Sequence, residues 1–187
     1  MHAQVAAPPF LDLTPFEQLR LDPFHLTVTQ RHPALAGAIA DCVQELRTDR
    51  ECLVHGDFSP KNVVVGDDGW WILDFEVAHL GAPVFDIACL LSHLLLKAAA
   101  MPEHAAQLAF AGRDFLAGYR TAGPARPVST NLGRQIGCLL LARVDGTSPV
   151  DYLDETTAQR VRRVAVQALT SESVAVDDLW AAVAAVR

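Results

Sequence analysis

Basic charge is scarce in this sequence. Lys61 and Lys97 are its only lysines, and 22 acidic residues outnumber the 15 lysines and arginines, which gives a formal net charge of −7. Proteins that bind nucleic acid normally carry a basic stripe that neutralises phosphates. The sequence therefore predicts no nucleic-acid partner.

Cysteine pairs and long apolar runs are also missing. The four cysteines are widely spaced without a C-x-x-C pair, which predicts small core residues in a reducing compartment and no disulfide framework. The N-terminus lacks the charged start and the apolar run of a signal peptide. The longest apolar run, residues 87–96, is interrupted by Ser92 and His93 and is too short to span a bilayer. We therefore expect a cytoplasmic protein without a membrane partner.

The sequence does contain enough apolar residues for one folded domain, since 51% of its 187 residues are hydrophobic. Residues 1–14 are rich in proline and alanine and predict a loose lead-in. Apolar residues at helical spacing then predict helices within 15–48. The first of these is expected to end near Leu21, because Asp22-Pro23 repeats the signal of a helix start.

A β-favouring region, 51–76, separates these helices from the rest. Its short runs of β-branched and aromatic residues include two that flank Gly66-Asp-Asp-Gly69, which predicts a hairpin turn. Both strands are apolar at successive positions, so we expect the hairpin to be covered on both faces. Helical periodicity then predicts a bundle over 86–187, with Asp86 as the cap of its first helix. The predicted fold class is mainly α with a small β-hairpin (α+β).

Three polar residues converge at one end of this hairpin. Asp57, in His55-Gly-Asp57, precedes Asn62 by five residues, and Asp74 ends the strand that folds back antiparallel beside Asn62. Phosphoryl transfer needs a carboxylate that orients the acceptor hydroxyl, and oxygen ligands for a magnesium ion that bridges the β- and γ-phosphates. The arrangement suits holding a metal-bound phosphate against a nucleophilic hydroxyl.

These segments resemble the catalytic and metal-binding segments of the protein-kinase-like phosphotransferases: the aminoglycoside phosphotransferases, choline kinases and methylthioribose kinases. The resemblance implies that Asp57 is the catalytic aspartate and that Asn62 and Asp74 bind magnesium. Glu76 is a further candidate for the metal sphere, and a purely structural role explains it equally well. The resemblance also implies Mg²⁺ as cofactor, ATP as co-substrate and a small molecule with a hydroxyl group as acceptor.

Two residues are expected to support the catalytic loop. Gly81-Ala-Pro-Val-Phe-Asp86-Ile-Ala resembles the family segment G-x-P-x-x-D-[LI]-A, in which the aspartate ties the loop to the following helix. His55 is expected to anchor the same loop.

Three further residues are candidate contacts to phosphate or substrate. Ser59 and Lys61 follow the catalytic aspartate closely, although a solvated Lys61 explains the sequence equally well. Residues 141–151 resemble a late helix end of methylthioribose kinases, where an arginine reaches the active site. That resemblance makes Arg143 a candidate substrate contact.

One part of a kinase-like enzyme is not found. Upstream of His55 there is no lysine and only one glycine, Gly37, so a glycine-rich loop and a strand lysine that hold ATP have no place there. We therefore expect a C-terminal lobe alone, over residues 15–187, with little or no activity in isolation and a surface that docks a missing N-terminal lobe or forms a dimer. The alternatives are a non-catalytic lobe that acts as an interaction or metal-binding module, and a metal-dependent phosphohydrolase.

The acceptor is not specified by these motifs. An aminoglycoside pocket would favour many carboxylates, and the late helices offer Asp145, Asp151, Asp154 and Glu155. Ordinary acids at helix ends account for these four residues equally well.

Overall fold

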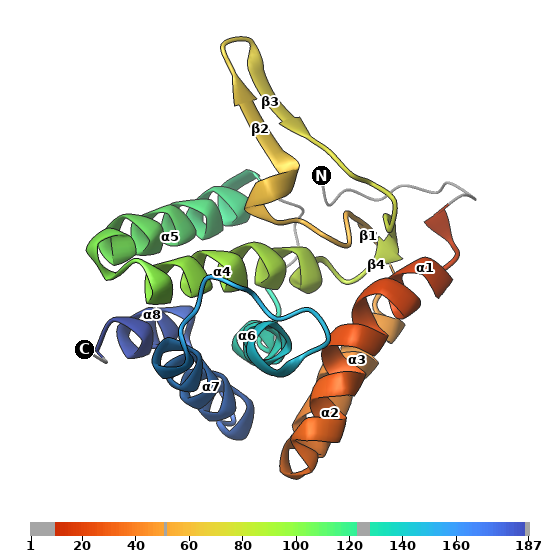
Figure 1. The fold of residues 1–187 in the computed structure, drawn as a ribbon. Coiled ribbons are helices and arrows are strands. Elements are labelled where there is room, and N and C mark those ends of the chain that lie inside the picture. The colour runs from red at the N-terminus through yellow and green to blue at the C-terminus, as the bar shows by residue number, and fades with distance from the viewer. Residues whose placement is uncertain (1–9, 51, 123–127, 186–187) are drawn as a thin grey trace.

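The computed structural model describes residues 10–50, 52–122 and 128–185, so most of the predicted lead-in lies outside the described residues. A bundle of helices carries a projecting hairpin (Figure 1). The N-terminal arm comprises α1 (Thr14–Phe16), the π-helix η2 (Glu17–Leu26), α2 (Thr27–Arg31), the 3₁₀ turn η3 (Pro33–Leu35) and α3 (Ala36–Thr48). The strands are β1 (Cys52–Val54), β2 (Val63–Gly66), β3 (Gly69–Ile72) and β4 (His79–Gly81), with the 3₁₀ turn η4 (Pro60–Asn62) before β2. The remaining helices are α4 (Pro83–Ala100), η5 (Pro102–His104), α5 (Ala105–Ala122), α6 (Leu132–Asp145), α7 (Glu155–Thr170) and α8 (Val176–Ala185). The predicted fold class, mainly α with a small β part, is confirmed.

Helix α4 is the centre of the bundle. It packs against α5 and α6, and 13 of its 18 residues are buried, as an apolar sequence on nearly all sides predicts. Its length and composition would also suit a membrane span, but most of it is buried inside the protein, as in the core helix of a folded domain. The helix begins at Pro83, so the prediction that Asp86 caps it is wrong: Asp86 lies in its first turn.

The N-terminal arm does not break at Asp22-Pro23, contrary to the prediction. Proline cannot donate to an α-helical ladder and its ring crowds the preceding turn. The chain accommodates Pro23 by widening into a π-helix, in which the N–H of Thr27 reaches the carbonyl of Asp22. Such wide turns are frequent at functional sites, and this one carries Arg20.

Two separate antiparallel pairs make up the β part. Strand β1 pairs with β4, with Leu53 opposite Leu80, and β4 was not anticipated from the sequence. Strands β2 and β3 form the predicted hairpin, which closes through Gly66 opposite Gly69. The first pair anchors the catalytic loop to the bundle, and the hairpin extends away from it.

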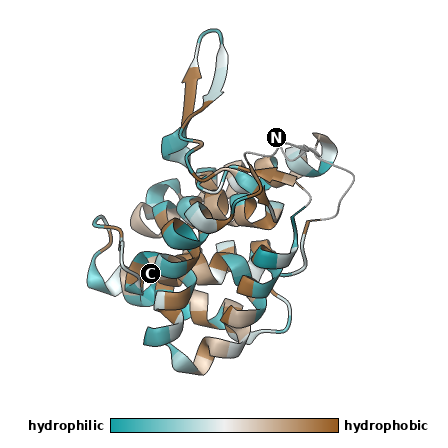
Figure 2. Ribbon diagram, turned by 90° about the vertical axis from the view of Figure 1, so that its right-hand side faces the viewer, coloured by the Kyte–Doolittle hydropathy of each residue, from teal (hydrophilic) through white to brown (hydrophobic). Residues whose placement is uncertain are grey.

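The prediction that the hairpin is covered on both faces is wrong for this structure. Figure 2 shows the hairpin standing clear of the bundle with apolar residues along it. Val65 is 62% exposed and Trp70 74% exposed, and Val64 and Trp71 are also exposed. The apolar pattern of the strands is real, but no described part of the chain packs on it.

Candidate active site

The loop after β1 carries Asp57, and its path requires a glycine. Gly56 has a φ of +81°, in the left-handed region that favours glycine. A Cβ atom built at Gly56 would lie 2.7 Å from the carbonyl oxygen of Val77, closer than real Cβ contacts. The chain can therefore turn between β1 and Asp57 only because position 56 has no side chain.

Asp86 fixes this loop from the first turn of α4. Its fully buried carboxylate accepts hydrogen bonds from the backbone N–H groups of His55, at 2.7 Å, and Gly56, at 2.9 Å. Hydrogen bonds to an ionised acceptor are stronger than neutral ones. Asp86 is predicted to tie the loop to the following helix, and it does contact His55 and Gly56, the two loop residues before Asp57.

His55 joins the catalytic loop to the chain that leads into Asp74. Its Nδ1 accepts a hydrogen bond from the backbone N–H of Asp57 (3.2 Å), and its Nε2 lies 2.7 Å from the carbonyl oxygen of Leu73. Because Nδ1 accepts, the proton belongs on Nε2, which donates to Leu73. The N–H of Leu73 in turn bonds to the carbonyl of Asn62, so Asn62 and the residue before Asp74 lie side by side.

The carboxylate of Asp57 is almost fully buried and surrounded by donors. Its Oδ2 lies 2.9 Å from Nζ of Lys61 and 3.1 Å from Nη2 of Arg20, and it accepts a hydrogen bond from Nδ2 of Asn62 at 3.2 Å. The same Nδ2 also donates to the backbone carbonyl of Asp57. No hydrogen bond or ion pair from a described residue reaches Oδ1, and Asp57 lines the cavity described below.

Arg20 is a site residue that the motifs did not indicate. Besides the ion pair with Asp57, its Nε donates to the carbonyl of Gly56 at 3.1 Å and its Nη1 donates to the carbonyl of Leu19. It comes from η2, 37 residues before Asp57 in the chain, and no local sequence signal links the two. Arg20 thus braces both Asp57 and the glycine turn.

A cavity of about 180 Å³ opens over Asp57. It is lined by residues of η2, the catalytic loop and the end of α6, namely Leu19, Arg20, Pro23, Phe24, Asp57, Lys61, Arg143 and Ser148. The guanidinium carbon of Arg143 lies 4.9 Å from the ring centroid of Phe24, and its Nη1 donates to the carbonyl of Ser148 at 3.2 Å. The predicted substrate contact Arg143 and the predicted catalytic aspartate therefore face one cavity.

The predicted metal ligands are partly brought together. Asp74 adopts a left-handed conformation with φ of 69°, and the carboxylates of Asp74 and Glu76 are exposed, without a hydrogen bond or ion pair to any other described residue. Three or more His, Cys, Asp or Glu side chains do not cluster as metal ligands anywhere in the described ranges. Magnesium needs only one or two carboxylates, with phosphate and water as further ligands. Asp74 and Asn62 carry oxygens of this kind and their role as metal ligands stays a prediction, whereas Oδ2 of Asp57 is already engaged with cations.

Ser59 and Lys61 have different surroundings. The side chain of Lys61 is 61% exposed but bonds to Asp57, so it is not simply a solvated lysine. Ser59 is fully buried, and its hydroxyl has no hydrogen-bond partner in the part of the chain that the structure describes. Lys61 lines the cavity over Asp57 and Ser59 does not, and both phosphate contacts stay predictions.

None of the four late acids lines the cavity over Asp57. Asp145 is held by Arg162 at 2.6 Å and by His32 at 2.8 Å, and the hydrogen bond from Arg162 is the main cause that lowers the pKa of Asp145. Asp154 caps α7 by accepting from the N–H of Thr157. Of the other two, Glu155 accepts from Gln159 and Asp151 is exposed.

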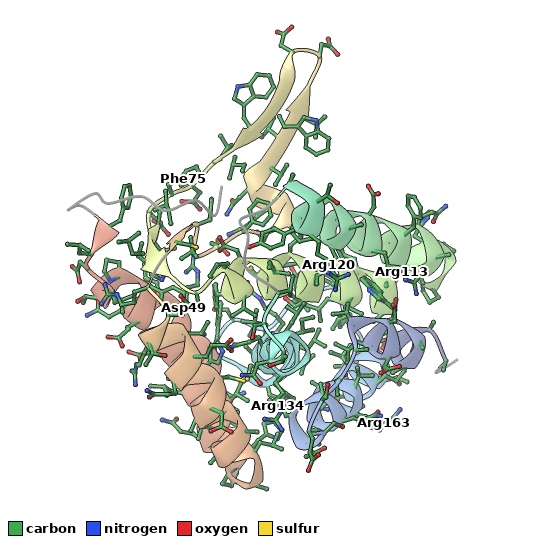
Figure 3. The ribbon with its side chains drawn as sticks, turned by 180° about the vertical axis from the view of Figure 1, so that it is seen from behind. Asp49, Phe75, Arg113, Arg120, Arg134 and Arg163 are labelled. Carbon is green, nitrogen blue, oxygen red and sulfur yellow. The ribbon has the colours of Figure 1, made fainter. Side chains whose placement is uncertain are left out.

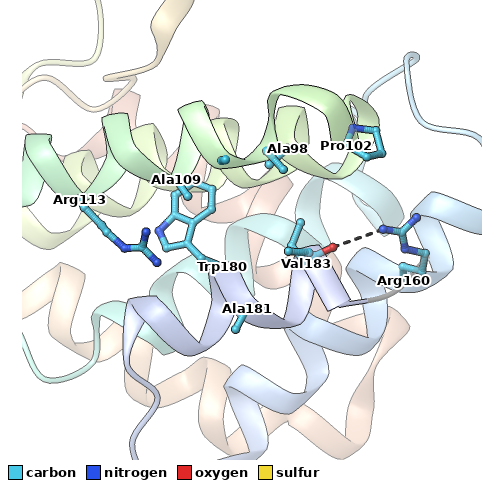
Figure 4. A pocket seen from close by; sticks show the side chains of 11 residues that line it. Ala98, Pro102, Ala109, Arg113, Arg160, Trp180, Ala181 and Val183 are labelled. Carbon is cyan, nitrogen blue, oxygen red and sulfur yellow. Dashed lines mark hydrogen bonds between the residues drawn. The ribbon is translucent and has the colours of Figure 1, made fainter.

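A larger cavity of about 400 Å³ lies away from this site, between α4, α5, α7 and α8 (Figure 4). Alanines from several helices, with Trp180, Arg113 and Arg160, form much of its wall. Its lining contains no carboxylate and no hydroxyl, so it offers no group for phosphoryl transfer.

Residues 4–127 match the phosphotransferase enzyme family, APH. This match covers most of the chain, including the catalytic loop, the hairpin and α4, and the chain therefore belongs to that family. The match names the family as a whole, so the resemblance to methylthioribose kinases stays a prediction, and Arg143 lies outside the matched residues. No curated protein matches the chain significantly.

Proposed function

We propose that this chain is the catalytic lobe of a phosphotransferase that moves the γ-phosphate of ATP to a hydroxyl group of a small molecule, with Asp57 as general base. One observation supports this most strongly. Asp57 lines a cavity, with Oδ2 bound by Lys61, Arg20 and Asn62 and with no described residue bonded to Oδ1. A carboxylate held in this way presents one oxygen to an incoming hydroxyl.

In the proposed reaction the acceptor hydroxyl donates its proton to Oδ1 of Asp57 as its oxygen bonds to the γ-phosphorus. The bond from that phosphorus to the β,γ-bridging oxygen breaks, and ADP leaves. Lys61, which is exposed and next to Asp57, can pair with a phosphoryl oxygen as charge shifts. Arg20 and Asn62 keep the carboxylate oriented throughout, so the loop does not need to reorganise.

Asn62 and Asp74 are the residues that would hold magnesium, with Glu76 as an outer contact. Bound there, magnesium would supply positive charge that offsets the phosphate charge of ATP. The link from Asn62 through Leu73 supports this assignment, because it fixes the backbone of both ligands relative to each other.

The base assignment is tested by ADP formation from MgATP with a panel of small alcohols. Asp57→Asn should lower turnover about 10²–10⁴-fold, the usual contribution of a general base, and should leave the circular dichroism spectrum unchanged. Asp67→Asn, at the exposed hairpin tip, is the matched control and should keep full turnover. Undiminished ADP formation by Asp57→Asn would refute the role. We expect weak turnover from this chain alone.

The metal assignment has its own readout. Binding of Mn²⁺ as a magnesium substitute, followed by water proton relaxation in the presence of ADP, should weaken in Asp74→Asn and persist in Asp67→Asn. Equal Mn²⁺ affinity in the two variants would contradict the role of Asp74.

A second candidate, an interaction module without turnover, is favoured by the exposed apolar hairpin. Such a surface suits a missing lobe or a second copy of the chain. Sedimentation velocity separates the two candidates: the module predicts self-association that Asp74→Ala leaves unchanged and Trp70→Ser weakens.

A further inference from the structure

The cavity over Asp57 carries an excess of positive charge. Among the eight residues that line it, Arg20, Lys61 and Arg143 are cationic and Asp57 is the single carboxylate. Arg20 and Lys61 both form ion pairs with Asp57, so the negative charge of this carboxylate is already neutralised. A protein of net charge −7 thus places three of its few basic groups around one acid.

Arg143 is the cation of this cavity that forms no ion pair with a described residue. Its Nη1 donates to the carbonyl of Ser148, and its guanidinium lies against the ring of Phe24. No carboxylate of a described residue lies within ion-pair distance of it. Guanidinium has five N–H donors in a planar fork, and stacking on an aromatic ring keeps that fork oriented. Most of its donors are therefore available to a ligand.

The surroundings of Arg143 on α4 do not offset its charge. His93 lies near enough for Arg143 to influence it, and its pKa is lowered to about 4, chiefly by burial and next by the field of Arg143. His93 is therefore neutral at pH 7. Lys97, on the same helix, adds a further positive charge in this region and lies over the ring of Tyr152.

We propose, on the basis of the function proposed above, that the acceptor is itself an anion: a hydroxyl compound whose carboxylate or phosphate group pairs with Arg143 while its hydroxyl faces Oδ1 of Asp57. A planar fork suits either group through paired hydrogen bonds. The four acids that would have bound a polycationic acceptor do not line this cavity, and Asp145 and Asp154 are bound elsewhere. The structure thus favours an anionic acceptor over an aminoglycoside.

The proposal is tested by binding, so that it does not depend on turnover. The whole chain is titrated with D-glycerate and with glycerol 3-phosphate as anionic probes, and with glycerol and choline as neutral and cationic probes, by nuclear magnetic resonance. We expect at least one anion to bind about tenfold or more tightly than glycerol, the effect of one charge-assisted contact. The better of the two anions identifies the group that Arg143 recognises.

Variants locate the effect. Arg143→Gln should weaken anion binding about tenfold and leave glycerol unaffected. Arg163→Gln is the matched control, since Arg163 is exposed on α7 at the end of the bundle away from the hairpin (Figure 3). Ser148 is exposed on a loop, so substitutions there leave the core intact. Ser148→Asp should weaken anion binding because it places a carboxylate beside Arg143, whereas Ser148→Asn should not weaken it.

Two results would overturn the proposal. One is equal affinity for glycerol, choline and both anions. The other is anion affinity that stays within about twofold in both Arg143→Gln and Ser148→Asp, below the tenfold expected from a lost contact. Either result leaves the role of Asp57 open, because that role is decided by ADP formation and not by acceptor binding.

Discussion

Replacing Asp86 by asparagine should loosen the catalytic loop and destabilise the whole protein. The carboxylate is fully buried and accepts from two backbone N–H groups, those of His55 and Gly56, through separate oxygens. Asparagine has nearly the same shape but only one acceptor oxygen, and its amide nitrogen is a donor. One loop N–H would therefore face another donor in a buried place.

The magnitude follows from these two bonds. A buried N–H without a partner costs roughly 1–3 kcal/mol. The bond that remains loses the contribution of the negative charge, about 1 kcal/mol. The free energy of unfolding should therefore fall by roughly 2–4 kcal/mol, which for a chain of this length lowers Tm by roughly 5–15 °C.

Urea unfolding followed by circular dichroism at 222 nm measures this change, because the helices dominate that signal. Hydrogen exchange of the His55 and Gly56 amides reports on the loop itself and should become faster in Asp86→Asn. Asp114→Asn is the control: Asp114 is exposed on α5 and its variant should stay within about 0.5 kcal/mol of the parent. A change in Asp86→Asn no larger than that of the control would refute the reasoning.

Two further predictions concern stability. Burial lowers the pKa of His25 from 6.5 to about 4, so the unfolded chain takes up the proton first. The contribution of His25 to stability should thus be complete above pH 6.5 and fall by about 3 kcal/mol as the pH drops to 4. His93, whose pKa is also lowered to about 4, adds to the same slope. His25→Gln should therefore reduce the slope in urea titrations, and an unchanged slope would contradict the prediction. Gly56→Ala should lower the free energy of unfolding by roughly 2–4 kcal/mol, because of the positive φ at this position and the clash with Val77. The control Gly118→Ala, in open space on α5, should raise the free energy of unfolding by about 0.5–1 kcal/mol. Similar urea midpoints in the two variants would argue against strain at Gly56.

The hairpin shows what a sequence pattern can and cannot predict. The glycines of Gly66-Asp-Asp-Gly69 specify a local turn, and the structure has that turn. Whether Val65 and Trp70 are covered depends on what packs on them, and a strand that is apolar on both faces carries no information about that. The turn was therefore predicted correctly and the burial was not.

The interruption expected at Asp22-Pro23 was wrong for a related reason. Proline forbids the α-helical hydrogen bond at its own position, which the sequence shows, but the chain has the further choice of a wider turn. Burial of Leu21 and Phe24 in the core keeps the segment helical across the proline. Local propensity predicted a break, and tertiary packing decided against it.

Some residues of the site belong to local motifs, and others reach it only through the fold. Asp57, Asn62 and Asp74 could be proposed from the sequence because their spacing follows from a short loop and a hairpin, which are local structures, and because that spacing resembles the family's motif. Arg20 could not be found in this way, since it reaches Gly56 and Asp57 only through the fold of η2 against the catalytic loop. Arg143 likewise enters from the end of α6, beyond residues 4–127, which carry the family match. The groups that hold Asp57 and those that face an acceptor thus come from different parts of the chain. Substitutions on η2 and α6 can therefore alter the charge of the cavity without changing the spacing of the three motif residues.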